Sequence, residues 1–194
     1  MLILFLVAKS SKKFRSEIYQ PLNNNLNLLI FAVMPLFMPA RLKSCCRYRR
    51  CDSLSINQGT TIRHHNISEL KLTDQNGTPA ISIFSGSPRK IPIEIKIMEK
   101  HPIATQSFLP VQNHDWLVVV SKEKNELPDL DTLRCFHVDG NVGITYKANI
   151  WHHPLLVKKK QDFWIIDRIQ DKEISSTNLK EYHFKQNEIK YITN

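Results

Sequence analysis

From residue 53 onward, short runs of the chain alternate apolar and polar positions, which is the pattern of half-buried β-strands. The clearest run, IPIEIKIME (91–99), puts four isoleucines on one predicted face: Ile91, Ile93, Ile95 and Ile97. The run WLVVV (116–120) has no polar position, so we expect a strand covered on both sides. Runs rich in β-branched or aromatic residues predict further strands at 80–84, 133–138 and 163–167.

Segments rich in Gly, Pro, Asn and Asp separate these runs, at 74–79, 85–90, 112–115, 122–129 and 139–143. Helical periodicity is scarce, although LPDLDTLRC (127–135) and STNLKEY (176–182) could each carry a helical turn or two. Many short strands joined by such turns are typical of a β-sandwich or β-barrel. The pattern therefore predicts an all-β domain with few short helical turns.

Residues 1–51 do not follow this pattern. Their longest apolar run, LNLLIFAVMPLFM (26–38), is shorter than the roughly 20 residues that span a bilayer, and Pro35 interrupts it. We expect 52–194 to form the domain and 1–51 to be a segment outside it. One hypothesis is that this segment is not native, through a wrong start codon or a shifted reading frame. The other is a poorly ordered leader or targeting sequence.

Charge and cysteine usage also differ between the two parts. The net charge of the 194 residues is +9, but residues 1–51 contribute +8 of it and residues 52–194 only +1. A balanced domain gives no reason to expect a nucleic-acid or membrane partner. Three of the four cysteines lie before residue 52, and none forms a CxxC pair, so a zinc site is not expected. The single cysteine of the domain, Cys135, suits a reducing compartment such as the cytoplasm.

Candidate chemistry is concentrated in two segments. On a strand through 91–99, Glu99 and His101 share one face and Lys100 lies opposite. Gln106 follows closely enough to return to the same place. Further along, YKANIWHHP (146–154) supplies a tyrosine, a lysine, a tryptophan and two histidines. Because adjacent strand residues face opposite ways, one histidine of the pair should point inward and the other outward.

Each of these residues also has a structural explanation. Trp151 could be core packing, and one of His152 and His153 could be bonded only to backbone. A third segment, IRHHN (62–66), places Arg63 and His65 on one face, but Arg63 could be a plain surface cation. Spacing alone does not decide between these alternatives.

Several motifs, taken in order, resemble the ureidoglycolate lyases, formerly called ureidoglycolate hydrolases. IMEKHPIATQSFLP (97–110) is similar to that family's E-R-H-P-x-x-[ST]-Q-x-F-[IL]-P, and VGITYKANIWHHPLL (142–156) to its G-[VI]-N-Y-x-x-x-x-W-H-H-P-L. INQGTTIRHHN (56–66), LVVVS (117–121), PDLDTLRCF (128–136) and DFWIIDR (162–168) also match in order. The resemblance runs from about Ser55 to about Phe184 and does not include 1–50.

The resemblance implies a cupin-like β-barrel or double-sheet sandwich, a homodimer, and cleavage of ureidoglycolate into glyoxylate and urea in allantoin degradation. Two alternatives stay open: a non-catalytic cupin-type binding module, and an inactive product with a disrupted N-terminus. Ser85 stands where the family often has an arginine, a loss that could weaken binding of an anionic substrate.

The resemblance also suggests roles for the candidate residues. His101 and His152 would share the acid and base roles, since histidine titrates near neutral pH. Gln106 and Tyr146 would hold the ureido group, and Arg63 or Lys147 the carboxylate. The remaining candidates for substrate binding are His65, Trp151 and His153.

A metal ion is an open question at the same place. Cupin barrels often hold a divalent ion with two histidines of an H-x-H motif, a glutamate and a later histidine. Here Glu99, His101 and His152 would form a reduced version of that set, for nickel or manganese. The missing H-x-H motif argues for weak binding or none.

Overall fold

The computed structural model describes residues 53–65, 67–169 and 176–193, together with the backbone of 2–5, 36–37 and 40–42. The two hypotheses about residues 1–51 concern a segment that lies almost entirely outside the described residues. The described chain is nearly all β, as predicted. Its only helical elements are the 3-10 turns η2 (Asn57–Gly59), η3 (Asp74–Asn76) and η4 (Ser176–Asn178). In the part of the chain described here, no helix has the length and apolar character needed to cross a membrane.

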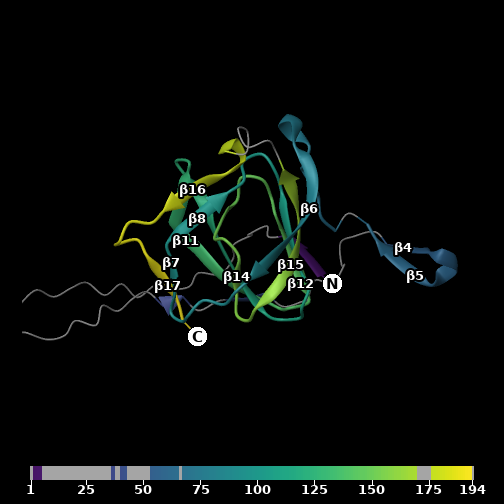
Figure 1. Cartoon of the computed structure of the whole chain (residues 1–194), viewed down its shortest axis with the longest axis horizontal. Coiled ribbons are helices and arrows are strands. Elements are labelled where there is room, and N and C mark those ends of the chain that lie inside the picture. Colours follow the sequence, from purple (N-terminus) through teal and green to yellow (C-terminus); the bar gives the residue numbers. More distant parts are fainter. Residues whose placement is uncertain are drawn as a thin grey trace, which may run out of the picture.

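The strands form two main sheets (Figure 1). The first has the spatial order β1 (Leu2–Phe5), β12 (Val142–Tyr146), β9 (Gln106–Pro110), β15 (Gln161–Ile169) and β6 (Thr78–Gly86). The second has the order β16 (Lys180–His183), β8 (Ile97–Lys100), β13 (Trp151–His152), β10 (Trp116–Lys124), β11 (Leu127–Val138) and β3 (Ala40–Leu42), and β14 (Leu156–Val157) also pairs with β10.

Two smaller groups of strands complete the fold. A three-stranded sheet has the order β2 (Leu36–Phe37), β17 (Lys190–Ile192) and β7 (Ile93–Ile95). The hairpin of β4 (Ser53–Ile56) and β5 (Thr61–His64) projects from the body of the molecule (Figure 1).

Strand β10 lies between two hydrophobic clusters. Its residues Trp116, Val118 and Val120 pack in the inner cluster, between the two main sheets. Leu117 and Val119 point the other way, into an outer cluster that residues of β7 and β17 cover. All five side chains are buried. The prediction that WLVVV is covered on both sides is therefore confirmed, and the arrangement is that of an all-β, cupin-like sandwich.

The structure corrects two local predictions. Ile93 and Ile95 are buried, but Ile91 is 51% exposed, so the four isoleucines do not share one buried face. The ladder breaks at Lys96, because β7 pairs with β17 while β8 pairs with β16 and β13. The segment 127–135, suggested as a helical turn, is instead part of the long strand β11, which pairs with β10. Of 176–182, only Ser176–Asn178 is helical.

Cys135 in the outer cluster should resist alkylation. Burial raises the pKa of its thiol to about 12, so at pH 8 its thiolate fraction is about a thousand-fold below that of an exposed cysteine. We expect iodoacetamide at pH 8 to label Cys135 only after urea unfolds the protein, as read by peptide mass spectrometry. Labelling of the folded chain at the unfolded rate would show that the thiol is accessible.

Candidate functional site

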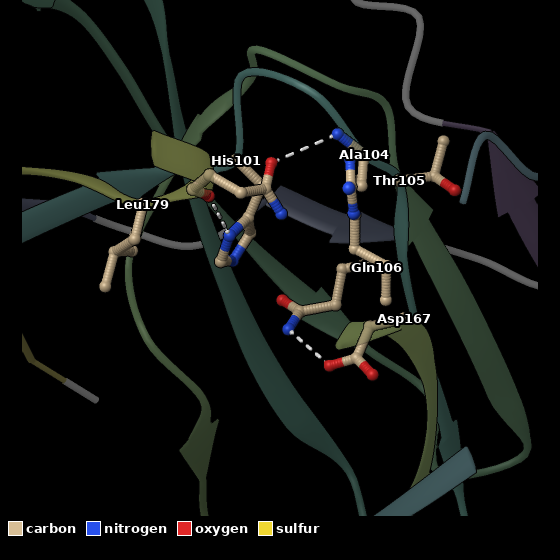
Figure 2. Close-up of a pocket in the computed structure, with 8 residues that line it drawn as sticks. His101, Ala104, Thr105, Gln106, Asp167 and Leu179 are labelled. Atoms are coloured by element: carbon tan, nitrogen blue, oxygen red, sulfur yellow. Dashed lines mark hydrogen bonds between the residues drawn. The ribbon is translucent and has the colours of Figure 1, made fainter. Parts of the chain in front are cut away.

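One end of the space between the two main sheets holds a small cavity of about 140 Å³. Its lining comes from three separate parts of the chain: His101, Ala104, Thr105, Gln106, Asp167, Arg168, Asn178 and Leu179. Figure 2 shows the side chains of His101, Gln106 and Asp167 converging on the same space. The volume is well below the roughly 300–1,000 Å³ of drug-sized pockets, so the cavity suits a ligand of few atoms.

Strand pairing brings the first candidate residues together. His152 of β13 lies directly opposite Glu99 of β8, and the chain continues from β8 to His101. The rings of His101 and His152 are 5.5 Å apart, and one ligand atom from each of Glu99, His101 and His152 lies within 4.8 Å of the others. Lys100 points the opposite way, with its ammonium group 4.9 Å from the Trp151 ring. The predicted alternation along this strand is therefore confirmed.

Backbone carbonyls fix the orientation of both rings. Nδ1 of His101 is 2.9 Å from the carbonyl oxygen of Asn178, and Nδ1 of His152 is 2.8 Å from that of Ile150. A carbonyl only accepts, so each Nδ1 must carry the hydrogen. Each neutral ring then keeps a lone pair on Nε2. Nε2 of His101 is buried without a hydrogen-bond partner among the described residues, and Nε2 of His152 is 3.5 Å from Glu99 Oε1.

Burial and the charges of neighbouring side chains shift the pKa values of His101 and Glu99. Burial, followed by the charge of His152, holds the pKa of His101 below its ordinary value, so the ring is neutral at pH 7. Burial acts to raise the pKa of Glu99, but the positive charge of the neighbouring histidines when they are protonated, that of His152 first, outweighs it. The pKa of Glu99 therefore lies below its usual range, and the carboxylate is ionised beside two imidazoles.

Tyr146 and Gln106 complete the contacts around the histidines. The Tyr146 ring stacks on His152, with centroids 3.9 Å apart and an angle of 14° between the planes. Gln106 Nε2 donates to Asp167 Oδ2 at 3.4 Å (Figure 2). Burial raises the pKa of Asp167. The structure thus brings together Glu99, His101, Gln106, Tyr146 and His152, as the sequence predicted.

Other predicted substrate-binding residues lie elsewhere. Arg63 is exposed on β5, and His65 follows it at the end of the projecting hairpin. Lys147 is exposed on the turn after β12. These three do not line the cavity. Alternation along a strand predicts which face a side chain takes, but not whether the strand belongs to the body of the fold.

Trp151 and His153 are buried, but neither residue lines the cavity. Trp151 packs in the outer cluster, on the opposite side of β13 from His152. His153 is 2% exposed, with Nδ1 2.6 Å from the carbonyl oxygen of Pro154, and burial lowers its pKa to about 4. We expected one histidine of the pair to face outward, whereas both are buried because this sheet is covered on both faces.

Six of the eight cavity residues were not singled out from the sequence, and three of these have polar side chains that the site depends on: Asn178, Asp167 and Arg168. Asn178 holds the loop after His101, because its side-chain oxygen accepts from the backbone N–H groups of Ile103 and Ala104 at 3.0 and 3.2 Å. Asp167 was detectable, since alternation along DFWIIDR puts it on the same face as the buried Phe163 and Ile165. Arg168, which is also buried, ends the same motif, but alternation puts it on the opposite face from Asp167 and so gave no reason to expect it in the site.

The donor set of the site allows two kinds of chemistry. The free Nε2 of His101 can accept and return a proton next to the cavity. Glu99, His101 and His152 also offer one carboxylate oxygen and two imidazole nitrogens, a donor set that suits a divalent transition metal. The hydrogen bonds that both Nδ1 atoms make with backbone carbonyls are those that orient metal-bound histidines in proteins. The residues present therefore fit a metal ion as well as an acid–base role.

Comparison with known proteins identifies the family. A family model described as ureidoglycolate lyase matches residues 40–190. The chain is 36% identical over 132 residues to ureidoglycolate lyase 1 of Rhizobium meliloti, covering 68% of this chain and 74% of the relative. It is 38% identical over 130 residues to the ureidoglycolate lyase of Brucella anthropi (66% and 73%) and 34% identical over 130 residues to that of Burkholderia mallei (66% and 75%). The chain belongs to the ureidoglycolate lyase family.

Proposed function

We propose that this protein is a carbon–nitrogen lyase that cleaves ureidoglycolate into glyoxylate and urea. The observation that carries the proposal is the buried, unpartnered Nε2 of His101, which lies at a small polar cavity in a member of this family. The cavity size supports a ligand as small as ureidoglycolate. Nothing in the described site favours the alternative of a binding module without turnover.

The reaction needs one proton moved between two atoms of the substrate. Ureidoglycolate carries a hydroxyl and a ureido nitrogen on the same carbon. His101 Nε2 accepts the hydroxyl proton while the electrons of that O–H bond form the aldehyde C=O and the C–N bond breaks. The departing nitrogen then takes the proton back from His101 and leaves as urea. A histidine with a lowered pKa suits this cycle, because it is neutral at pH 7 and ready to accept.

The neighbouring residues position this chemistry. His152 does not line the cavity, so we assign it the task of positioning Glu99, which lies opposite it, while the negative charge of Glu99 supports the positive charge that forms on His101. Tyr146 holds the His152 ring by stacking. Gln106 and Asp167 offer acceptors to the ureido N–H groups at the cavity wall. The acid and base roles first shared between two histidines thus fall to His101 alone.

A divalent ion, nickel or manganese, would be held by Glu99, His101 and His152. When bound, it would act as a Lewis acid on an oxygen of the substrate. One nitrogen cannot hold a metal and a proton at once, so the metal and acid–base roles of His101 exclude each other.

Replacing Glu99, one of the three proposed metal ligands, tests metal binding without altering His101. We expect Glu99→Gln to weaken binding of nickel to the chelator-treated protein by at least about 10-fold, measured by calorimetry. Glu94→Gln, which alters an exposed carboxylate paired with Lys96, should leave binding unchanged. Equal nickel affinity of wild type and Glu99→Gln would exclude this site as the metal centre.

We further propose a homodimer in the cytoplasm. The family resemblance supports the dimer, as do exposed apolar side chains on β6 and β15: Ile81, Ile83 and Trp164. The near-neutral charge of residues 52–194 supports the absence of nucleic-acid and membrane partners. Light scattering should give twice the chain mass of 22.6 kDa.

The direct test is to incubate the purified chain with ureidoglycolate and follow glyoxylate and urea together. Equal amounts of both, above the spontaneous rate, are expected from the proposed lyase. Binding of glyoxylate without turnover would replace the proposal with a binding module. An insoluble chain that becomes soluble when residues 1–51 are replaced would indicate an inactive product.

A further inference from the structure

Arg168 is a buried cation whose hydrogen bonds are incomplete. It lines the cavity with His101 and Gln106, and only 7% of it is exposed. Its Nη2 donates to the carbonyl of Gln75 at 3.2 Å, but Nε and Nη1 are buried with no partner in the described part of the chain. A buried guanidinium group with unmet donors is unfavourable, and removing a charge from water costs more still. The missing partner is therefore an acceptor that the described chain does not supply.

The loop around Gly77 holds this guanidinium group in place. A methyl group at position 77 would lie 2.1 Å from Arg168 Nε and 2.4 Å from Nη2. The backbone of Gly77, with φ −71° and ψ 144°, is one that any residue can adopt. A side chain at position 77 would therefore push the guanidinium end of Arg168 aside without straining the backbone. The donors of Arg168 are held ready at the cavity before a ligand arrives.

Unmet acceptors line the same cavity. Gln106 Oε1 and Asp167 Oδ1 are both buried without a hydrogen-bond partner among the described residues. By strand alternation Asp167 and Arg168 leave opposite faces of β15, and both still line the cavity at the end of this strand. Unmet donors and unmet acceptors around one small space are complementary to a ligand that carries both an anion and N–H groups.

We propose that Arg168 binds the carboxylate of the substrate through the end-on fork of Nη1, which is unpaired, and the second N–H of Nη2, while Gln106 and Asp167 accept hydrogen bonds from its ureido end. This inference rests on the proposed function and names the anion subsite of the same cavity. Two parallel N–H donors on a planar fork match the two oxygens of a carboxylate. Arg168 thereby takes the carboxylate-binding role that was first considered for Arg63 and Lys147. It also explains how the protein could bind an anion although position 85 is a serine and not an arginine.

Two small ligands of the same shape test the charge specificity. Glycolate carries a carboxylate beside a hydroxyl, and glycolamide replaces the carboxylate with a neutral amide. We expect Arg168→Gln to weaken glycolate binding about 10–100-fold, measured by NMR titration, and to leave glycolamide binding nearly unchanged. Arg134→Gln, which removes an exposed arginine of β11, should bind both ligands like the wild type.

A second variant keeps the positive charge of Arg168 but changes the position of its guanidinium group. Gly77→Ala should displace the guanidinium group and weaken glycolate binding in the same direction, so it decides the question even where Arg168→Gln fails to fold. Unchanged glycolate binding in either folded variant would overturn the subsite. Equal weakening of glycolate and glycolamide would also overturn it, because a purely structural arginine affects both ligands alike.

The two proposals fail in different ways. Wild-type protein that binds glycolate through Arg168 but releases no glyoxylate from ureidoglycolate would refute the lyase and keep the anion subsite. Full turnover with an unchanged KM in Arg168→Gln would refute the subsite and keep the lyase.

Discussion

Replacing His101 by alanine is expected to lower kcat for ureidoglycolate cleavage by about 10²–10⁴-fold, the usual contribution of one acid–base group. The reason is that His101 provides the free Nε2 at the cavity, and the backbone carbonyl of Asn178 fixes the orientation of its ring. The measurement is the steady-state rate of glyoxylate formation, corrected for spontaneous decay. KM should change much less than kcat, because carboxylate and ureido contacts remain.

The matched control for this substitution is His183→Ala. The side chain of His183 is 72% exposed on β16, so its loss should leave kcat unchanged. A His101→Ala variant that retains more than about a tenth of the wild-type kcat would move the proton-transfer role to another group. His152 would be the next residue to test.

Replacing Ile165 by alanine is expected to lower the free energy of unfolding by about 2–5 kcal/mol. Ile165 is completely buried in the inner cluster, between β6 and β9 of the first sheet. Deleting three carbons there removes apolar contacts and leaves a cavity that close-packed neighbours fill only partly. Urea unfolding followed by tryptophan fluorescence measures the difference.

Ile169→Ala is the control for this loss of stability. Ile169 lies on the same strand, with the same residue type and on the same side by alternation, but it is 56% exposed. Its replacement should change the free energy of unfolding by no more than about 0.5 kcal/mol. Similar losses for both variants would contradict the assignment of Ile165 to the core.

The sequence predicted those parts of the fold that depend on local alternation. WLVVV was identified as covered on both faces, and Glu99 and His101 as sharing one face, because side chains on a strand alternate strictly. The break at Lys96 was not predictable, since it arises where neighbouring strands pair with different sheets. LPDLDTLRC was misjudged because tertiary pairing with β10 overrides weak local preferences.

The site was predictable to the extent that its residues lie in compact motifs. Glu99, His101 and Gln106 come from one short segment, and family resemblance linked them to His152. Arg168 also lies in a matching motif, DFWIIDR, but nothing in that motif indicates that its side chain reaches the site. Its burial depends on a loop nearly a hundred residues earlier, where Gly77 leaves room for it. From the sequence alone, a single arginine is expected to lie at the surface. The sequence therefore gave no reason to prefer Arg168 to Arg63 as the residue that binds the carboxylate.

The double covering of β10 has a consequence for electrostatics. His152 pairs with Val120 of this strand, so the wall behind the site is apolar on both sides and holds no bulk water. The local dielectric constant there is far below that of the solvent, and dissolved ions screen such interactions poorly. The pKa shifts of Glu99 and His101 therefore depend on their buried neighbours and are largely independent of the salt in which the protein is dissolved.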